Sequence, residues 1–307
     1  MRNAFADEIT KLADADPRVV LLSGDIGNRL FNTFKEHHPD RFLNCGVAEA
    51  NMIGVGAGMG LSGLRPVTYT ITTFVTSRCY EQIKLDVCYH KAPVIITGVG
   101  AGLSYASLGP THHSFEDIAS LRALPGLTIL CPADPWEVRA ALRAALKLNG
   151  PVYLRLGKKG EPPLHADVPE FEIGRALVMR EGTDVALLST GNILPNVLAA
   201  AELLQAAGIS AGVLNFHTVK PLDQERLQQV FGGTKLVATI EEHSLIGGFG
   251  SAVAEWAADQ GPFPARLVRF GIPDRFIHEA GNQKYARKKA GLSAEAIAER
   301  IKEQFHK

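Results

Sequence analysis

A carboxylate, an imidazole and a guanidinium occur in this sequence at points where strands are expected to end and helices to begin. Glu49 stands in FLNCGVAEAN (42–51), directly before an Ala/Gly-rich segment with the pattern of a helix. Phe74 and Arg78 follow a β-branched run, and His112 lies in a Gly-Pro loop. Carboxyl and imidazole groups are the side chains most often used to move protons in enzymes. The helix dipole alone also favours an acid in a first turn, so the case for Glu49 depends on these neighbours, which occupy loops where open α/β sheets bind ligands.

The glycines of MIGVGAGMG (52–60) do not form a dinucleotide-binding fingerprint. They lie inside the expected helix, whereas a fingerprint puts its first glycine in the turn after a strand, with an acid about 20 positions on. Glycine costs a helix up to about 1 kcal/mol per residue. Small residues at Gly54, Ala57, Gly58 and Gly60 let another backbone approach closely. We therefore expect tight helix packing here, including packing between subunits.

Length and charge exclude several classes of protein. The chain has 307 residues, enough for two domains with full cores. Lys+Arg and Asp+Glu both number 32, so no basic field favours nucleic acid or a membrane surface. No apolar run approaches the roughly 18 residues of a membrane span, and the N-terminus lacks a signal-peptide core. Four cysteines without a C-x-x-C pair fit a reduced compartment. We expect a cytoplasmic protein whose partners are small molecules or proteins, not nucleic acid or membrane.

Short β-branched runs alternate with longer amphipathic segments, which is typical of parallel sheets covered by helices. Strands are predicted at 19–22, 66–70, 94–97, 128–131 and 152–154, and after a break at 185–188, 212–215, 236–240 and 265–270. Helices in the second series are predicted at 194–207, 249–258 and 293–302. The break at 158–171 is rich in proline and charge and is predicted to be a linker. The fold class is therefore α/β, with two three-layer α/β/α domains at 1–160 and 172–307.

Six motifs, in this order and spacing, resemble the C-terminal half of a transketolase. They are SGD (23–25), GVAEAN (46–51), GPTH (109–112), CPAD (131–134), KPLD (220–223) and EEHSLIGGFG (241–250). The wider superfamily, which includes 1-deoxyxylulose-5-phosphate synthase and the β subunits of 2-oxo-acid dehydrogenases, shares many of them. The resemblance runs nearly end to end. It implies a pyrimidine-binding domain at 1–160 and a transketolase C-terminal domain at 172–307.

The resemblance implies thiamine diphosphate as the cofactor. In this family a glutamate at the position of Glu49 hydrogen-bonds the aminopyrimidine ring, so that the cofactor removes its own proton while the protein supplies the proton relay. Phe74 would pack against the pyrimidine ring, although an ordinary core aromatic explains this residue equally well. The same resemblance places Arg78 and Asp25 among the cofactor-binding residues.

The resemblance also assigns substrate-binding residues. His112 matches the family histidine that reaches the donor sugar, and Arg2 and Lys158 fall near family cations that bind sugar phosphate. Exposed charges of this kind are also common on protein surfaces. Leu108, however, replaces the acid that contacts a donor hydroxyl, and a phosphate-binding histidine is replaced in VGAG (99–102). Losing that hydrogen bond redirects sugar preference, which argues against a standard pentose phosphate pathway role.

A motif that the cofactor needs is missing from the chain. The sequence has no GDG followed by the downstream Asn that holds Mg²⁺ and diphosphate in this family, and GDIG (24–27) is not that motif. We therefore expect no metal ligand in this chain, Mg²⁺ ligands from an N-terminal transketolase-like partner subunit, and an α2β2 assembly. EEHS (241–244) and GGFG (247–250) would then serve packing and dimer contacts.

The leading hypothesis is the β subunit of a split transketolase that takes a two-carbon ketol unit from a ketose, phosphorylated or not, and delivers it to an aldose. The alternative enzyme is a β subunit of a 2-oxo-acid dehydrogenase, and GPTH favours the transketolase. The third hypothesis is a non-catalytic assembly subunit. Glu49 and His112 argue against it because packing requires neither.

Overall fold

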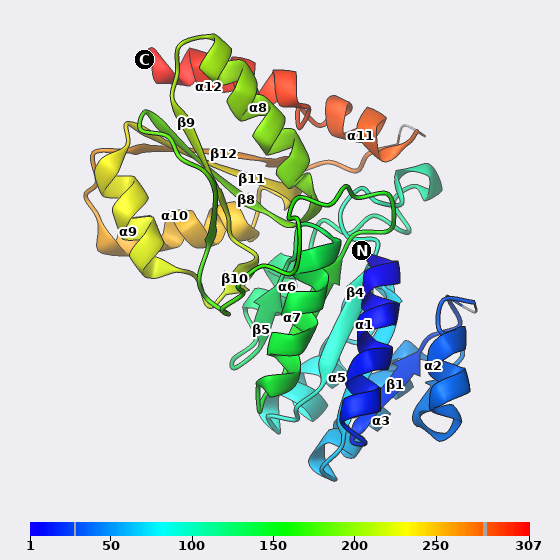
Figure 1. The fold of residues 1–307 in the computed structure, drawn as a ribbon. Helices are drawn as coiled ribbons and strands as arrows, with labels where there is room; N and C mark the ends of the chain where they lie inside the picture. The colour runs from blue at the N-terminus through cyan, green and yellow to red at the C-terminus, as the bar shows by residue number, and fades with distance from the viewer. Residues whose placement is uncertain (28, 279–280) are drawn as a thin grey trace.

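A seven-stranded sheet organises the first half of the chain (Figure 1). The computed structural model describes residues 1–27, 29–278 and 281–307. The strand order is β10-β5-β6-β4-β3-β1-β2, and every neighbouring pair is parallel except β10 and β5. The strands are β1 (Val19–Ser23), β2 (Phe42–Asn44), β3 (Arg65–Ile71), β4 (Ile95–Val99), β5 (Thr128–Leu130), β6 (Val152–Leu156) and β10 (Thr218–Lys220).

Helices cover both faces of this sheet. On one face α1 (Arg2–Ala15) packs beside α7 (Pro135–Lys147), and Phe5 and Ile9, four residues apart, point from α1 into the core. Asp134 caps α7 by accepting from Glu137 N. The opposite face carries α3 (Glu49–Leu61), the π-helical segment η2 (Ile83–Tyr89) and α6 (Asp117–Arg122). The remaining short helices of this half are α2 (Asn32–His37), η1 (Pro39–Arg41), α4 (Thr72–Thr76), α5 (Tyr80–Gln82) and η3 (Ala106–Leu108).

The second half forms a five-stranded sheet of order β12-β11-β8-β9-β7, parallel except for β7 against β9. In Figure 1, α8 and α12 lie on one face of it and α9 and α10 on the other. The strands are β7 (Leu177–Arg180), β8 (Val185–Thr190), β9 (Ala211–Asn215), β11 (Leu236–Ser244) and β12 (Arg266–Ile272). The helices are η4 (Gly191–Ile193), α8 (Leu194–Ala206), α9 (Gln224–Gly233), α10 (Phe249–Gln260), α11 (Gln283–Lys289) and α12 (Ala294–Phe305). Both halves are therefore three-layer α/β/α units, as the sequence predicted.

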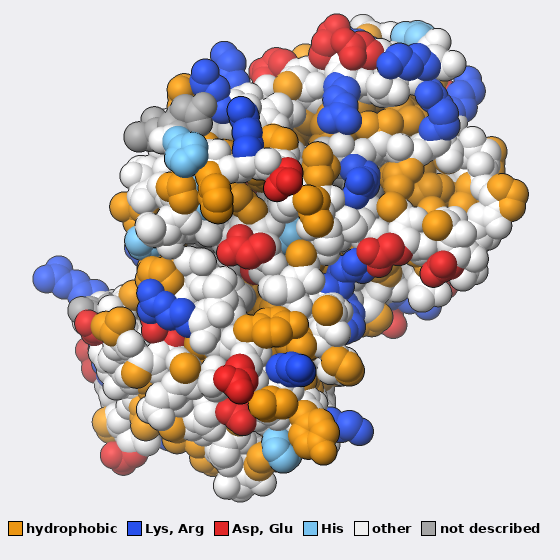
Figure 2. Space-filling view, turned by 180° about the vertical axis from the view of Figure 1, so that it is seen from behind, with side chains coloured by type: hydrophobic (Ala, Val, Ile, Leu, Met, Phe, Trp, Pro, Cys, Tyr) orange, Lys and Arg blue, Asp and Glu red, His pale blue; other side chains and the backbone are white. Residues whose placement is uncertain are grey.

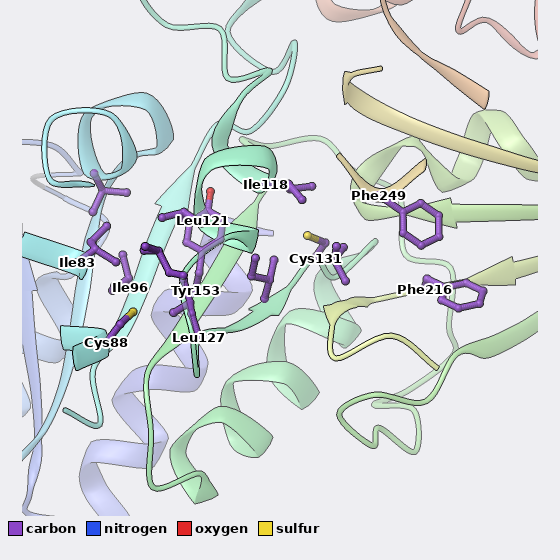
Figure 3. Packing of buried hydrophobic residues seen from close by; sticks show 14 of the residues in the cluster. Ile83, Cys88, Ile96, Ile118, Leu121, Leu127, Cys131, Tyr153, Phe216 and Phe249 are labelled. Carbon is purple, nitrogen blue, oxygen red and sulfur yellow. The ribbon is translucent and has the colours of Figure 1, made fainter. Parts of the chain in front are cut away.

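The two halves share a hydrophobic core. One cluster of buried side chains runs from Ile118 and Cys131 in the first half to Phe216 and Phe249 in the second (Figure 3). In addition, β10 comes from the second half but pairs with β5 in the first sheet. The sequence boundaries at 160 and 172 stay a prediction, and the packing crosses them at both places.

Every strand predicted from the sequence is present, with ends that differ by at most two residues except in β11, which runs four residues beyond the predicted end at 240. The strands that the sequence missed are β2, β7 and β10, each three or four residues long. Such short segments show no alternation that a pattern search can detect. The expected linker contains no helix or strand, and the backbone N–H groups of Leu164 and His165 anchor it to Asp134 at 2.7 and 3.2 Å.

Acidic and basic side chains are interspersed over the face of the molecule in Figure 2, as the balanced composition predicts. In the described part of the chain, no helix is long and apolar enough to cross a membrane.

The glycines of α3 let this helix approach the sheet closely. A Cβ built on Gly60 would lie 3.2 Å from Pro93 Cδ, and one on Gly56 would lie 3.5 Å from Thr68 Cγ2. A Cβ on Gly58 would meet nothing within 4 Å. Part of the small-residue pattern therefore serves packing inside the chain, and packing between subunits stays a prediction for the outward face.

A buried ion pair lies at the junction of the two halves. Arg155 Nε donates to Asp117 Oδ2 at 2.6 Å, and both side chains are fully enclosed. The Tyr153 hydroxyl donates to the same carboxylate oxygen at 2.7 Å. Burial opposes ionisation of Asp117, but Arg155 and His243 hold its pKa below the ordinary value of 3.8. The pair is therefore charged over the whole neutral range.

Replacing Asp117 by Asn should destabilise the fold by about 3–5 kcal/mol, because it leaves the Arg155 charge buried without a counter-charge. Since the pKa of folded Asp117 is depressed, its contribution is complete above pH 3.8 and is lost as pH falls through the folded pKa. Urea unfolding measures both effects. Glu255→Gln, which breaks the surface pair with Arg122, is the control and should cost under about 1 kcal/mol. Equal losses in the two variants would contradict the assignment.

Candidate active site

The carboxyl ends of the parallel strands bring the candidate residues to one edge of the first sheet. Asp25 follows β1, Glu49 follows β2 and Phe74 follows β3. The loop 100–116 follows β4, and Lys158 follows β6. Because these strands are parallel, their carboxyl ends lie at the same edge. The topology thus collects residues that are more than 100 positions apart in the sequence.

Glu49 is the first residue of α3, and its side chain is only 5% exposed. Arg78 donates from Nη1 to Glu49 Oε2 at 3.0 Å, and no other described residue donates to this carboxylate. The positive end of the helix dipole favours the negative charge. Burial, followed by the charge of Glu49, raises the pKa of the neighbouring Cys79 thiol to about 12. The second oxygen, Oε1, is therefore available to accept a hydrogen bond from a ligand.

Phe74 joins Glu49 to the histidine loop. Its ring centroid lies 4.2 Å from the guanidinium carbon of Arg78 and 5.3 Å from the centroid of the His112 ring. Phe74 is only half-buried, whereas a core aromatic is enclosed on all sides. Glu49, Arg78, Phe74 and His112 therefore form one continuous row.

His112 is held in place from its own loop. Its Nδ1 lies 2.9 Å from Thr111 Oγ1. Burial, followed by the charge of Lys158, lowers the pKa of His112 below its ordinary value of 6.5. The imidazole is therefore neutral at pH 7 and can accept or donate a hydrogen bond. The adjacent His113 is buried and packs against Phe115 at 5.2 Å between ring centroids.

Two cations continue the row beyond His112. The Lys158 Nζ lies 4.3 Å from the centroid of the Tyr105 ring. Burial, followed by the charges of Lys159 and Arg2, lowers the pKa of Lys158. Among the described residues, the buried Nε of Arg2 has no hydrogen-bond partner. The charge of Arg2 acts on Lys158, and two neighbouring cations favour binding of an anion.

Asp25 lies at the same edge, but no hydrogen bond among the described residues joins it to Glu49. Its backbone N–H donates to Gly46 O at 3.0 Å, and its exposed carboxylate accepts from Asn44 Nδ2 at 3.2 Å. Asp25 therefore braces the turn that leads into Glu49. A direct role for it with a cofactor stays a prediction.

Tyr105 is the member of the row that the sequence did not identify. It bridges His112, at 5.9 Å between ring centroids, and Lys158. The signal in the sequence is Gly100, since a Cβ there would lie 1.9 Å from Tyr105 Cε2 and the backbone has φ +85°. Only glycine leaves room for this ring.

Exposed apolar side chains flank the row. Val47, two residues before Glu49, is 78% exposed, and Leu108, in the histidine loop, is 50% exposed. Two apolar side chains therefore lie exposed close in sequence to Glu49 and His112, the acid and the imidazole of the row.

Comparison with known proteins identifies related families. The family model described as "Transketolase, pyrimidine binding domain" matches residues 1–162, and the one described as "Transketolase, C-terminal domain" matches residues 174–297. A solved structure described as "Split gene transketolase, inactive beta4 tetramer" superposes with a TM-score of 0.90 at 35% identity, covering 99% of this chain and 97% of that one.

Two curated relatives are similar over most of their lengths. The chain is 39% identical to the 6-deoxy-6-sulfo-D-fructose transketolase subunit SqwH of Clostridium sp. (strain MSTE9), covering 97% of this chain and 92% of the relative. It is 38% identical to one of the subunits of an apulose-4-phosphate transketolase from Actinobacillus succinogenes, covering 87% of this chain and 85% of the relative. The chain spans about half (46%) of the length of 1-deoxy-D-xylulose-5-phosphate synthase 1 of Geobacter sulfurreducens, at 38% identity over 96% of this chain.

The environment of His112 predicts a measurable pKa shift. In NMR titrations with ring-labelled histidine, His112 should titrate below 6.5, because burial and the charge of Lys158 disfavour the imidazolium. Lys158→Met should raise the pKa of His112, and the neighbouring exposed Lys159→Met is the matched control. An unmoved pKa in Lys158→Met, or the same movement in both variants, would show that Lys158 does not face His112.

Proposed function

The chain belongs to the transketolase family, and on that premise we propose that it is the C-terminal subunit of a split, thiamine diphosphate-dependent transketolase. It would transfer a two-carbon ketol unit from a ketose donor to an aldose acceptor. The observation that carries this proposal is the row from Glu49 to Lys158, which lies open at the sheet edge. It offers an acid, an aromatic face, a neutral imidazole and two cations along one wall.

The residues fit the pyrimidine end of thiamine diphosphate. An aminopyrimidine whose ring nitrogen carries a proton needs a hydrogen-bond acceptor for that N–H and an apolar surface for its face. Glu49 Oε1 is available as that acceptor, and the half-buried Phe74 ring supplies the surface. When bound, this cofactor supplies the carbanion chemistry that breaks and forms the carbon–carbon bond. Glu49 would hold the proton at the ring nitrogen, and Arg78 fixes the orientation of the carboxylate.

His112 and Tyr105 lie on the donor side of the row. Because the pKa of His112 is lowered, its neutral imidazole can hydrogen-bond a sugar hydroxyl and take up a proton there. Tyr105 lies between His112 and Lys158 and contacts both. In this proposal, Glu49 interacts with the cofactor and His112 interacts with the donor sugar.

The remaining wall is proposed to come from a partner subunit. The chain has no GDG motif to hold Mg²⁺ and diphosphate, so these ligands would come from an N-terminal transketolase-like chain in an α2β2 assembly. The similar split transketolase structure is described as an inactive β4 tetramer. That inactive state supports a need for the partner. All four cysteines are free thiols, which supports a cytoplasmic location.

We propose that the donor is a ketose with a terminal anionic group. The names of the two curated relatives specify a sulfo sugar and a sugar phosphate. Arg2 and Lys158, close enough for Arg2 to lower the pKa of Lys158, offer two cations for a sulfonate or phosphate. Leu108 replaces the acid that would select a donor hydroxyl. Recognition of the donor therefore depends more on its anionic group.

The partner requirement is testable by calorimetry. This chain alone should bind thiamine diphosphate and Mg²⁺ weakly or not at all, whereas a mixture with the N-terminal-half subunit should bind them tightly, because the diphosphate ligands lie on the partner. The mixture should then turn over ketose donors. Tight binding by this chain alone would contradict a cofactor site shared between two subunits. Turnover that needs a lipoyl domain would favour the hypothesis of a 2-oxo-acid dehydrogenase β subunit.

The variant Glu49→Gln tests the proposed role of Glu49 in the same mixture of subunits. An amide cannot hold the ring-nitrogen proton, so turnover in the mixture should fall by at least about 100-fold. The thermal unfolding midpoint should stay close to wild type. The control Glu202→Gln changes an exposed acid in the middle of α8 and should be silent. Full activity in Glu49→Gln would favour the hypothesis that the chain is a non-catalytic assembly subunit.

The two cations predict substrate selectivity. Arg2→Met and Lys158→Met should each raise the donor KM about 10- to 100-fold for a phosphorylated or sulfonated ketose, because each removes a charge that binds the anion. The KM for an uncharged ketose should change little. Lys159→Met again serves as the control. Equal effects on charged and uncharged donors would show that these cations do not bind the anion.

A further inference from the structure

The loop that carries Tyr105 and His112 rests on the second domain. Its apolar side chains Leu103, Ala106 and Phe115 belong to the hydrophobic core formed by α8, β8, β11 and α12. The Ser104 hydroxyl accepts from Asn192 Nδ2 and from Gln283 Nε2, both at 3.3 Å. The donor side of the row is therefore supported from the second half of the chain.

Glu242 on β11 makes the central contact with this loop. Its buried carboxylate oxygen Oε1 accepts from the backbone N–H of Leu103 at 2.5 Å and from Gln283 Nε2 at 2.9 Å. Arg287 Nε donates to the other oxygen, Oε2. Gly102 makes room for this contact, since a Cβ there would lie 2.7 Å from Glu242 Oε1 and its φ is +61°. The carboxylate is thus fully bonded only while the loop is docked.

The far end of the loop is tied to the same strand. Arg155 Nη2 donates to Ser114 O at 3.3 Å and to Glu242 O at 3.1 Å. The Ser244 N–H donates to Phe115 O at 2.9 Å. A bridge between Gly102 and Ser114 closes the base of the loop. Between these fixed ends lie Tyr105 and His112.

We propose that Glu242 is a positioning residue of this site: it fixes loop 100–116 and so sets where His112 and Tyr105 meet the donor. This inference rests on the proposed function. Glu49 and Phe74 stand on α3 and α4, and within the described chain no hydrogen bond of the Glu242 carboxylate reaches either helix. Loss of Glu242 should therefore damage donor binding and leave cofactor binding intact, which a general loss of stability would not do.

The neighbouring Glu241 offers a matched control. It lies on the same strand and is equally buried. Its carboxylate accepts from the backbone N–H groups of Phe249 and Gly250, each at 2.7 Å, at the start of α10. These bonds stay within the second domain and do not reach the loop. Glu241→Gln therefore reports on stability without a change in the loop contacts.

The first measurement needs no activity. In hydrogen exchange on this chain alone, Glu242→Ala should speed exchange of backbone amides in loop 100–116 at least about tenfold, because the Leu103 N–H loses its acceptor. Glu241→Gln should leave these amides unchanged. Glu242→Gln keeps an oxygen for Leu103 but puts an amide against Arg287, so it should lie in between. Should Glu242→Ala fail to fold, Glu242→Gln and Arg287→Met supply the test.

The second measurement uses the reconstituted complex. Glu242→Ala should raise the donor KM about tenfold or more, with a smaller fall in kcat and an affinity for thiamine diphosphate near wild type. Unchanged loop exchange, or equal losses of donor and cofactor affinity, would overturn the positioning role. If the wild-type complex transfers no ketol unit, the proposed function fails, and loop exchange still decides whether Glu242 positions the loop.

Discussion

The buried ion pair between Asp117 and Arg155 is the constraint on which the arrangement of the site depends. A charge buried in a protein interior must be paired and have its remaining hydrogen bonds satisfied. Arg155 meets this requirement with three partners: the Asp117 carboxylate, Ser114 O and Glu242 O. These partners lie on α6, on the histidine loop and on the second sheet. The pair is therefore fully satisfied only when both halves of the chain and the loop between them are docked together.

A parallel sheet supplies the other part of the explanation. Its strands need long connections, so the polar residues that follow successive strands are distant in sequence yet meet at one edge. Glu49 and Phe74 are carried there by helices packed on the sheet, while His112 and Lys158 arrive on loops. A rigid scaffold with residues on its edge forms one wall of a site. An aminopyrimidine or a sugar anion bound against it would remain open to solvent on its other side until a second chain covers it.

The sequence predicted this architecture wherever the signal is local. Alternating β-branched and amphipathic runs predicted the strands of both sheets except β2, β7 and β10, and the position of Glu49 at a helix start was confirmed. The role of Glu242 was missed because its contact with the loop is distant in the sequence, and that of Tyr105 because its contact with Lys158 joins segments that follow different strands. Glu242 bonds a residue 139 positions away, and no periodicity encodes such a pairing. β10 was missed because its three residues carry no pattern and its partner strand lies in the other half of the chain.

The two ends of the row depend on different supports, and under the proposed roles this separation would allow donor preference to change without loss of cofactor binding. Glu49 and Phe74 are fixed by α3, α4 and the first sheet. Leu108 lies in η3, whose Ala106 is buried in the core of the second half. A substitution at Leu108 therefore alters the half-exposed surface of a loop while the carboxylate keeps its bond to Arg78. Sites that share no contacts are nearly independent in free energy. If the proposed roles hold, a substitution at Leu108 can therefore change donor preference while Glu49 keeps its bond to Arg78.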